Sequence, residues 1–476
     1  MTTTMTITGA SGVVTLQGAT GRAEGPVGTL QSKINNDINN GTAKAFQLNP
    51  DSGNPDVPAG VAAVGIIDDA GTYQIPSLYQ YVVIADSAET GNITLNNNGL
   101  SANINILAGR QSGFTYNAGS ESGQIMNTAG SLVFNGEGQS GRWTIYTGEG
   151  NSTVRGSNGN NQINTGVGQN LVTLGSGNNR VYSEGSDTIT GGVGGYNALT
   201  LTGANSQVKL SENTLINDLG NHNTFDLGKN STVTGGTNAT VTFQEGPNNE
   251  LLSGTAITVS AVNGADLKVT QGSDANISVD GNLNFFNGYG QTTLTSKGQV
   301  VAFGARGSFG ESQSSYTLNA VGDKSALFVA DAGNESLNAS GSTASVQIYA
   351  NTVSGGGTNF VGIGGSGDDV LTAGTGNTTF TGGAGNNLFM FTKDNSQNGS
   401  TVITDFVNEG SHNTIGLFNY GLDTNSLATL LQNSQNDAQG NAVLNIDGQH
   451  TITIQNVSVS QLNTDQFLVA NNNSAA

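Results

Sequence analysis

The residues of this chain that could do chemistry are few, and most of them are acidic. Asp and Glu total 34 against 14 Lys plus Arg, and Cys is absent. Two adjacent acidic pairs stand out: Asp68 with Asp69, and Asp368 with Asp369. Adjacent residues of a strand point to opposite faces, so neither pair forms the facing carboxylates of a glycosidase. The net charge of −20 disfavours a nucleic-acid or anionic-membrane partner and suits calcium, cationic surfaces or solubility.

Other catalytic groups are not arranged in a recognisable motif. The sequence holds no His-Glu-x-x-His zinc helix, no Gly-x-Ser-x-Gly nucleophile elbow and no Cys nucleophile. His222, His412 and His450 each stand in a turn-like polar context, which predicts three surface residues. We therefore predict that the protein is not an enzyme. A β-helix acting on polysaccharides is the less favoured alternative.

Nine-residue units dominate the stretch from Gly364 to Met390, where GGSGDDVLT, AGTGNTTFT and GGAGNNLFM follow one another without a gap. The eighth place of each unit is apolar and the sixth place is polar. The eighth-place residues are Leu371, Phe380 and Phe389, and the sixth-place residues are Asp369, Thr378 and Asn387. Glycine-rich tight turns between short strands with one inward apolar residue fit this pattern.

A second block of four such units starts at Thr147 and reads TGEGNSTVR, GSNGNNQIN, TGVGQNLVT and LGSGNNRVY. Glycine occupies the fourth place of all four units. The eighth place of each unit is a β-branched residue, which predicts that this residue lies in a strand and faces inward. The eighth-place residues are Val154, Ile163, Val172 and Val181, and the sixth-place residues are Ser152, Asn161, Asn170 and Asn179. An Asp, Asp187, follows only after a one-residue deletion.

These units resemble the calcium-binding nonapeptides of RTX proteins, G-G-x-G-x-D-x-U-x, in which the Asp binds Ca²⁺ and the U residue points into a parallel β-roll. In such a roll, units one and three stack on the same side. The resemblance therefore implies one calcium site at Asp369, stacked on Asn387, with the carbonyls of Gly365, Gly367 and Gly385 as further ligands. A single carboxylate predicts weak binding, while Asp368 is expected to face solvent.

The asparagines of the first block predict a different chemistry. Ca²⁺ needs six to eight oxygen ligands and draws affinity from their charge, whereas an Asn amide offers one neutral oxygen and also donates hydrogen bonds. Stacked Asn side chains can instead bond to one another as a ladder. We expect the roll from residue 147 to 182 to be largely independent of calcium.

The segment Leu388 to Gly421 resembles the one that closes RTX rolls in type I-exported proteins. The matching residues are Phe389, Phe391, Ile403, Asp405, Phe406, Ile415 and Leu417, while Asn413 replaces a further Asp. The last twenty residues resemble an uncleaved type I secretion signal. The N-terminal residues do not show a basic region followed by an apolar region, as a cleavable secretory signal would. The sequence also has no apolar run of ~18 residues, the length that a membrane-spanning helix needs. The resemblance thus implies the type I secretion machinery as a partner, an extracellular or cell-surface location and no membrane insertion.

Strands must position these turns. Gly reaches 71 of 476 residues and charged residues only 10%, which predicts an all-β, parallel β-roll or β-solenoid with irregular rungs and short capping helices. One helix opens at Pro26, repeats Leu30, Ile34 and Ile38, and ends at Gly41; we expect it to cap the end of the sheet stack. A second helix is predicted over residues 425–432.

Four segments are expected along the chain. They are a cap helix with an irregular β region (1–145), a degenerate RTX-like roll (146–190), an irregular β-solenoid (191–360), and a C-terminal RTX roll with its closing segment and secretion signal (361–476).

Three functions fit this sequence. The favoured one is a non-catalytic secreted protein that self-assembles as a surface layer, filament or biofilm scaffold. The first alternative is an RTX adhesin or a glycan- or ice-binding module, for which a cell-surface polysaccharide is a candidate partner. Its discriminator is a regular Thr array or a ligand cleft. The second alternative is the β-helix enzyme.

Overall fold

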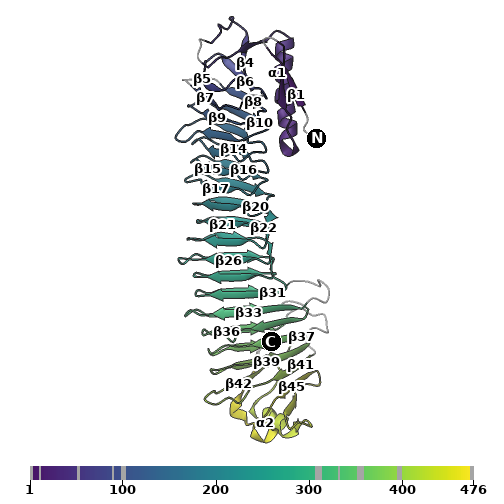
Figure 1. Ribbon diagram of the computed structural model, residues 1–476. Coiled ribbons are helices and arrows are strands. Elements are labelled where there is room, and N and C mark those ends of the chain that lie inside the picture. The colour runs from purple at the N-terminus through teal and green to yellow at the C-terminus, as the bar shows by residue number, and fades with distance from the viewer. Residues whose placement is uncertain are drawn as a thin grey trace, which may run out of the picture. The chain divides into compact units, whose positions relative to one another are not determined.

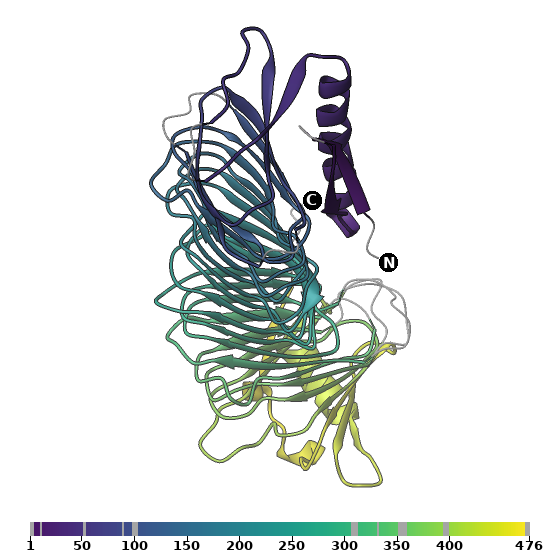
Figure 2. The same cartoon turned by 45° about the horizontal axis from the view of Figure 1, so that its top comes forward.

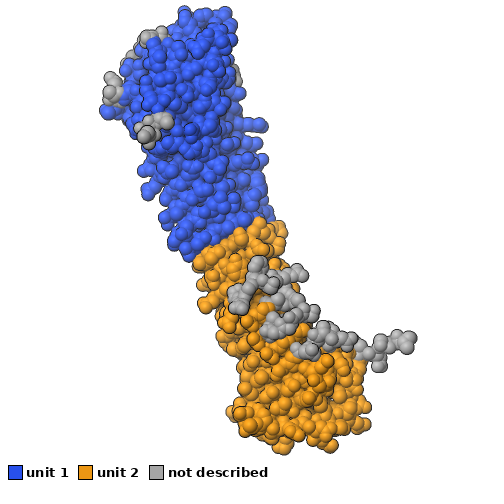
Figure 3. Space-filling view, turned by 90° about the vertical axis from the view of Figure 1, so that its right-hand side faces the viewer, with its two compact units in different colours: residues 1–240 blue, residues 241–476 orange. Residues whose placement is uncertain are grey.

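The structure, a computed structural model, describes residues 4–9, 12–50, 54–87, 90–97, 103–305, 313–330, 333–350, 359–393 and 399–471. It contains two compact units, residues 1–240 and 241–476 (Figure 3). Each unit is a parallel β-solenoid, and together they comprise about 18 turns. Two α-helices occur among the described residues. The predicted all-β solenoid is therefore confirmed.

Each rung of unit 1 contributes one strand to each of two parallel sheets (Figure 1). Sheet 1 consists of β3 (Ala43–Gln47), β4 (Ala62–Ile67), β6 (Tyr79–Ile84), β8 (Ile104–Ala108), β10 (Gly123–Asn127), β12 (Trp143–Tyr146), β14 (Gln162–Asn164), β16 (Asn179–Ser183), β18 (Asn197–Leu201), β20 (Thr214–Asn221) and β22 (Thr232–Thr237). Sheet 2 consists of β5 (Gly71–Ile75), β7 (Ile93–Asn97), β9 (Phe114–Asn117), β11 (Leu132–Asn135), β13 (Thr153–Arg155), β15 (Leu171–Leu174), β17 (Thr188–Gly191), β19 (Gln207–Leu210) and β21 (Thr224–Leu227). The division between the units falls within β23 (Thr240–Phe243).

The core of unit 1 lies between its two sheets and is lined by alternate residues of each strand. Val154 pairs in register with Val172, and Ile163 pairs with Val181. All four side chains are buried, which confirms both the predicted inward positions and the stacking of alternate nonads. The turns allow this stacking because they carry glycine: a Cβ on Gly159 would lie 2.1 Å from a backbone oxygen of the preceding rung.

Beyond residue 200 the turns change chemistry, and the nine-residue period ends. Asn205, Asn213, Asn230 and Asn238 adopt positive φ angles between 52° and 60°. Asn tolerates this left-handed conformation better than other side chains, so it turns the chain without glycine. Strands of the predicted irregular β-solenoid are nevertheless present from residue 197 to 243, because their alternate apolar residues still face the core.

Helix α1 (Glu24–Asn39) and the antiparallel hairpin β1 (Thr4–Thr8) and β2 (Val13–Gln17) lie beside the rungs of unit 1 (Figures 1 and 2). The buried Leu30 and Ile34 of the helix belong to one apolar cluster with outward residues of sheet 1. The expected position across the end of the stack is therefore wrong. The reason is that the outer face of sheet 1 is itself apolar here and needs a cover.

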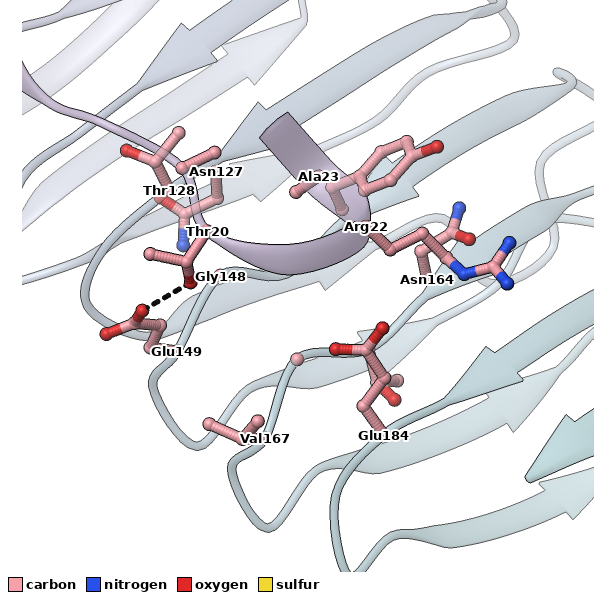
Figure 4. Close-up of a pocket in the computed structure, with 14 residues that line it drawn as sticks. Thr20, Arg22, Ala23, Asn127, Thr128, Gly148, Glu149, Asn164, Val167 and Glu184 are labelled. Carbon is pink, nitrogen blue, oxygen red and sulfur yellow. Dashed lines mark hydrogen bonds between the residues drawn. The ribbon is translucent and has the colours of Figure 1, made fainter. Parts of the chain in front are cut away.

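A short segment after the hairpin, η1 (Gly21–Ala23), attaches this cover to the rungs (Figure 4). The hydroxyl of Thr20 donates a 2.7 Å hydrogen bond to Glu149 Oε1. The guanidinium of Arg22 lies 3.4 Å from the centre of the Tyr182 ring, a cation–π contact. The cavity below this segment measures about 40 Å³, room for about one water molecule, so it is no ligand site.

Unit 2 repeats the two-sheet arrangement and closes with antiparallel strands. Its sheet 1 consists of β24 (Asn249–Leu251), β25 (Gly254–Thr255), β27 (Leu267–Thr270), β28 (Gly272–Ser273), β30 (Leu283–Phe286), β32 (Val300–Phe303), β34 (Ala326–Val329), β36 (Val346–Tyr349), β38 (Val370–Thr372), β40 (Leu388–Thr392), β42 (Thr414–Phe418) and β46 (Phe467–Ala470). Its sheet 2 consists of β26 (Thr258–Ala261), β29 (Asn276–Val279), β31 (Gln291–Ser296), β33 (Ser314–Ala320), β35 (Glu335–Asn338), β37 (Asn359–Ile363), β39 (Asn377–Thr381), β41 (Gly399–Ile403) and β45 (His450–Ile454), followed by the antiparallel β44 (Ala442–Asn445) and β43 (Gln435–Asn436).

Aromatic side chains fill the core of unit 2 near its C-terminal end. Phe360, Phe380, Phe389 and Phe406 follow one another with ring centroids 6.2 to 6.4 Å apart. The predicted second helix is α2 (Thr424–Asn433), capped by the side chain of Asp423. The helix predicted over residues 425–432 is thus confirmed.

Candidate metal centre

The sixth residue of each nonad points into its own turn and is buried. Exposed fractions lie between 1% and 3% for all seven of these side chains: Ser152, Asn161, Asn170, Asn179, Asp369, Thr378 and Asn387. A buried polar group is stable only when it forms a hydrogen bond or binds an ion. We therefore expect these side chains to contact a hydrogen-bond donor, an acceptor or a cation inside the turn. The identity of the sixth residue decides which of these it is.

Three asparagines on one side of unit 1 fill their turns with an amide group. Asn161 Nδ2 donates to the carbonyls of Ser157 (2.8 Å) and Gly159 (2.9 Å), the residues four and two places earlier. It also donates to Asn179 Oδ1 at 3.1 Å. Asn179 repeats the pattern with its own turn and donates to Asn197 Oδ1 at 3.1 Å.

This asparagine ladder, Asn161–Asn179–Asn197, confirms the predicted hydrogen-bonded stack. Each Nδ2 group lies among carbonyl oxygens, which are the ligands that Ca²⁺ prefers. A bound cation and an amide donor cannot occupy the same position. The ladder turns therefore do not fit calcium. The third member, Asn197, lies beyond the four nonads of the first block but stands 18 residues after Asn179, the spacing that also separates Asn179 from Asn161.

The opposite side of unit 1 contains a buried carboxylate with a full set of donors. Asp187 Oδ1 accepts from Asn170 N (3.0 Å) and Nδ2 (2.8 Å). Its Oδ2 accepts from the hydroxyls of Thr165 and Ser183. Four hydrogen bonds satisfy this carboxylate without a metal ion.

Asp369 in unit 2 has fewer protein donors. Its Oδ1 accepts from Val346 N (2.7 Å) and its Oδ2 from Gly365 N (2.6 Å). Its own N–H donates to Asn387 Oδ1 at 2.9 Å, which confirms the predicted stacking of the two residues. Asn387 N in turn donates to Asn413 Oδ1 at 2.8 Å.

Burial raises the pKa of Asp369 to about 6, because desolvation disfavours the charged carboxylate. The backbone N–H groups of Val346 and Gly365 oppose this shift, and the neighbouring Asp368 adds to it. Asp368 itself is exposed, as predicted, and accepts from Asn386 N at 2.7 Å. The Asp369 carboxylate is therefore ionised at neutral pH but poorly compensated.

The residues around Asp369 fit a cation better than those of the ladder turns. The sixth residue of this turn is an Asp, so it places no amide donor in the turn. Gly365 and Gly367 stand four and two places before Asp369, and in the ladder turns the residues at those two places accept from the Asn amide through their carbonyls. Within the described residues, however, no group of three or more His, Cys, Asp or Glu could hold a metal ion. One carboxylate plus carbonyls, including that of Gly385 on the stacked turn, would hold Ca²⁺ weakly.

Two polar residues of the closing region differ from what their sequence context suggests. Asp405 caps the preceding turn by accepting from the N–H groups of Gly382 (2.7 Å) and Gly383 (2.8 Å). His450 is buried, so the prediction of a surface histidine is wrong there, although His222 and His412 are exposed. The cause is its place as an inward residue at the start of β45.

Comparison with known proteins identifies the turn motif. A family model of the RTX calcium-binding nonapeptide repeat matches four copies in this chain, within residues 146–181 and 363–395. No curated protein and no solved structure shows a significant match. The chain thus carries RTX repeats in the two blocks where the turns were described above.

RTX nonapeptide repeats bind Ca²⁺, and they indicate a secreted, type I-exported protein with a β-roll. The repeat family is generally non-catalytic. In the part of the chain that the structure describes, no helix is long and apolar enough to cross a membrane.

Proposed function

We propose that this protein is a non-catalytic secreted structural protein that self-assembles on the cell surface or in the extracellular matrix. The observation that carries the proposal is an apolar, uncharged stripe on the outer face of sheet 1 in unit 2. Type I export would deliver the chain in soluble form, and copies would then associate through this stripe outside the cell.

The stripe consists of two columns of outward side chains on six successive strands, from β30 to β40. The first column is Phe286, Phe303, Val329, Tyr349, Thr372 and Met390, and the second is Asn284, Val301, Leu327, Gln347, Val370 and Leu388. Residues between them, such as Phe328 and Ile348, point into the core and are fully buried. All of the apolar outward side chains are half-buried, and the two exposed members of the columns are Asn284 and Gln347.

Unit 1 shows what such a face requires. There the outward residues of sheet 1 include Val83, Leu107 and Met126, and α1 with its hairpin covers them to 3% exposure or less. In unit 1 the apolar outer face of sheet 1 is therefore buried by another element of the same chain. The stripe of unit 2 has the same chemistry, so it suits a cover from another copy.

Charge favours a second copy of the same chain as the occupant. Like-charged proteins of −20 repel one another, but no residue of the two columns is charged. Two copies can therefore meet along the stripe without placing carboxylates in contact. Six strands ~4.8 Å apart give a face roughly 25 to 30 Å long, near the low end for a specific interface. A contact of this size suits a polymer in which it is repeated.

The test is assembly of purified protein, followed by light scattering and electron microscopy with and without Ca²⁺. We expect ordered polymers of the wild type, and strong inhibition of assembly by Leu327→Asp combined with Val370→Asp. Thr293→Asp, on the outer face of sheet 2, is the matched control and should assemble normally. Wild-type protein that stays monomeric under all conditions would sink the proposed function. If the double variant polymerises like the wild type, the contact between copies does not lie at the stripe.

A further inference from the structure

A groove of about 380 Å³ lies on the outer surface of unit 1, over strands β12 to β18. Its floor is a column of outward residues on consecutive strands of sheet 1. Thr144, Gln162, Arg180 and Ala198 are paired in register along β12, β14, β16 and β18. Successive side chains of this column are therefore spaced by one rung, ~4.8 Å.

The wall of the groove is a row of turn residues held in a second, exposed ladder. Asn160 Oδ1 accepts from Asn178 N at 2.9 Å, and Asn178 Oδ1 accepts from Tyr196 N at 2.9 Å. Both amides are fixed through their oxygens, which leaves their NH₂ groups to solvent as donors. Tyr196 ends the row with 49% of its surface exposed. The wall thus offers aligned donors beside an exposed aromatic ring.

Arg180 gives this groove its charge. Lysines elsewhere on the solenoid form ion pairs, such as Lys209 with Asp226 at 2.6 Å and Lys268 with Glu250 at 2.6 Å. Arg180 is exposed and has no ion pair among the described residues, and no Asp or Glu lines the groove. An exposed guanidinium without an ion pair can pair with an anionic ligand through a bidentate contact.

We propose that this groove binds a carboxylated polysaccharide, that is, an extended chain containing uronic acid units. The guanidinium of Arg180 pairs with a sugar carboxylate in a bidentate contact. The ring of Tyr196 stacks on the apolar face of a sugar, and the amides of Asn160 and Asn178 donate to its hydroxyls.

The repeat of the groove supports a polymeric ligand. The rung spacing is close to the length that one sugar unit adds to an extended polysaccharide, so the amides of Asn160 and Asn178 can meet two successive sugars. A free phosphate or a lone carboxylate would use Arg180 but would leave the ring and the aligned amides without a role. The net charge of −20 opposes an anionic ligand, so the attraction at Arg180 acts only within about one screening length, ~8 Å at physiological salt.

The test is calorimetric titration of the full chain with polygalacturonate fragments, without Ca²⁺ so that ion bridging is excluded. Carboxyl-reduced fragments of the same length are the neutral control. We expect Arg180→Gln and Tyr196→Ala each to weaken binding about tenfold or more, and neutral fragments to bind as weakly as the variants. Arg155→Gln is the matched control, because Arg155 is an exposed arginine on sheet 2.

Three results would overturn the proposal: no binding of the acidic fragments, equal binding of the reduced fragments, or equal losses in Arg155→Gln and Arg180→Gln. Circular dichroism of each variant excludes misfolding as the cause of a loss. The same titration with the Leu327→Asp, Val370→Asp variant, which we expect not to assemble, separates binding from polymerisation, because the stripe lies in unit 2 and the groove in unit 1.

Discussion

At the scale of single residues, the sixth place of each turn determines what fills the turn. An Asn fills it with an amide that donates to the turn's own carbonyls, as Asn161 and Asn179 do. An Asp cannot donate, so it needs hydroxyl or backbone donors, as Asp187 has, or a cation, as we expect at Asp369. We therefore expect that, among the described turns, those of the asparagine ladder bind no metal ion and the turn at Asp369 binds one.

Converting the asparagine ladder to carboxylates should create a dependence on calcium. In Asn161→Asp with Asn179→Asp, the turn carbonyls lose their donors and two buried anions lie one rung apart. We expect a loss of roughly 3 kcal/mol of stability without Ca²⁺, partly restored by millimolar Ca²⁺. Thermal denaturation with and without chelator measures this, with the exposed Asn158→Asp as control. Equal destabilisation in both conditions would contradict the cation interpretation.

Asp369 should make stability depend on pH in a defined direction. Its pKa in the folded state is about 6, above the ordinary value of 3.8, so the folded protein binds the proton more tightly than the unfolded chain. Its contribution is fully present below the ordinary pKa and is lost as pH rises to about 6, a change of roughly 2 to 3 kcal/mol.

Chemical denaturation from pH 4 to 7 without Ca²⁺ tests this, comparing wild type with Asp369→Asn. The variant should lack this part of the pH dependence and the stabilisation by Ca²⁺ at pH 7.5. The neighbouring exposed Asp368→Asn should keep most of both effects. If Asp369→Asn still responds to Ca²⁺ like the wild type, Asp369 is a turn residue and not a ligand.

At the scale of elements, α1 acts as a side cover for the apolar outer face of sheet 1. Leu30 and Ile34 anchor it, and Tyr81 on β6 donates a 2.9 Å hydrogen bond to Asp37 of the helix. The same carboxylate pairs with Lys33 at 2.9 Å on the solvent side. The helix is thus attached by packing and by one polar contact to a strand that is distant in sequence.

Removing an anchor of this cover should loosen α1. Leu30 is 3% exposed, and Leu30→Ala is expected to cost about 2 to 4 kcal/mol through lost burial and the cavity that remains. Limited proteolysis should then cut within residues 24–39 faster than in wild type. Ser32→Ala, exposed on the same helix, is the matched control. Unchanged proteolysis of Leu30→Ala would mean that this packing does not hold the helix in place.

At the scale of the whole molecule, the two RTX blocks belong to different compact units and have different turn chemistry. The block in unit 1 is filled by side-chain hydrogen bonds, and the block in unit 2 contains the turn that fits a cation. Calcium should therefore act on one block and not on the other.

Hydrogen exchange of the full chain with and without chelator tests this division. On removal of Ca²⁺ we expect faster exchange around residues 359–393, because a bound cation stabilises only the turns it contacts. Residues 147–190 should exchange at the same rate in both conditions and provide the internal control. Chelator-dependent exchange in that first block would show that its amides do not replace the metal.

Much of the fold could be predicted because short-range regularity specifies it. The β-branched eighth residues of the first block, such as Ile163 and Val181, predict inward positions, and the period of nine predicts that alternate units stack. Past residue 200 the period fails, because Asn turns such as Asn213 replace Gly turns and rung lengths vary. The strands remain predictable there, but their partners do not.

The sequence by itself determined the solenoid, its turns and the candidate turn at Asp369, since these depend on residues within two rungs of one another. Only the tertiary structure decided which outward residues stand side by side: the cover of α1, the stripe around Leu327, and the groove at Arg180 and Tyr196. Inward residues must be apolar and are visible in the period. Outward residues carry no such requirement, so their neighbours depend on the register of strands that no local pattern encodes.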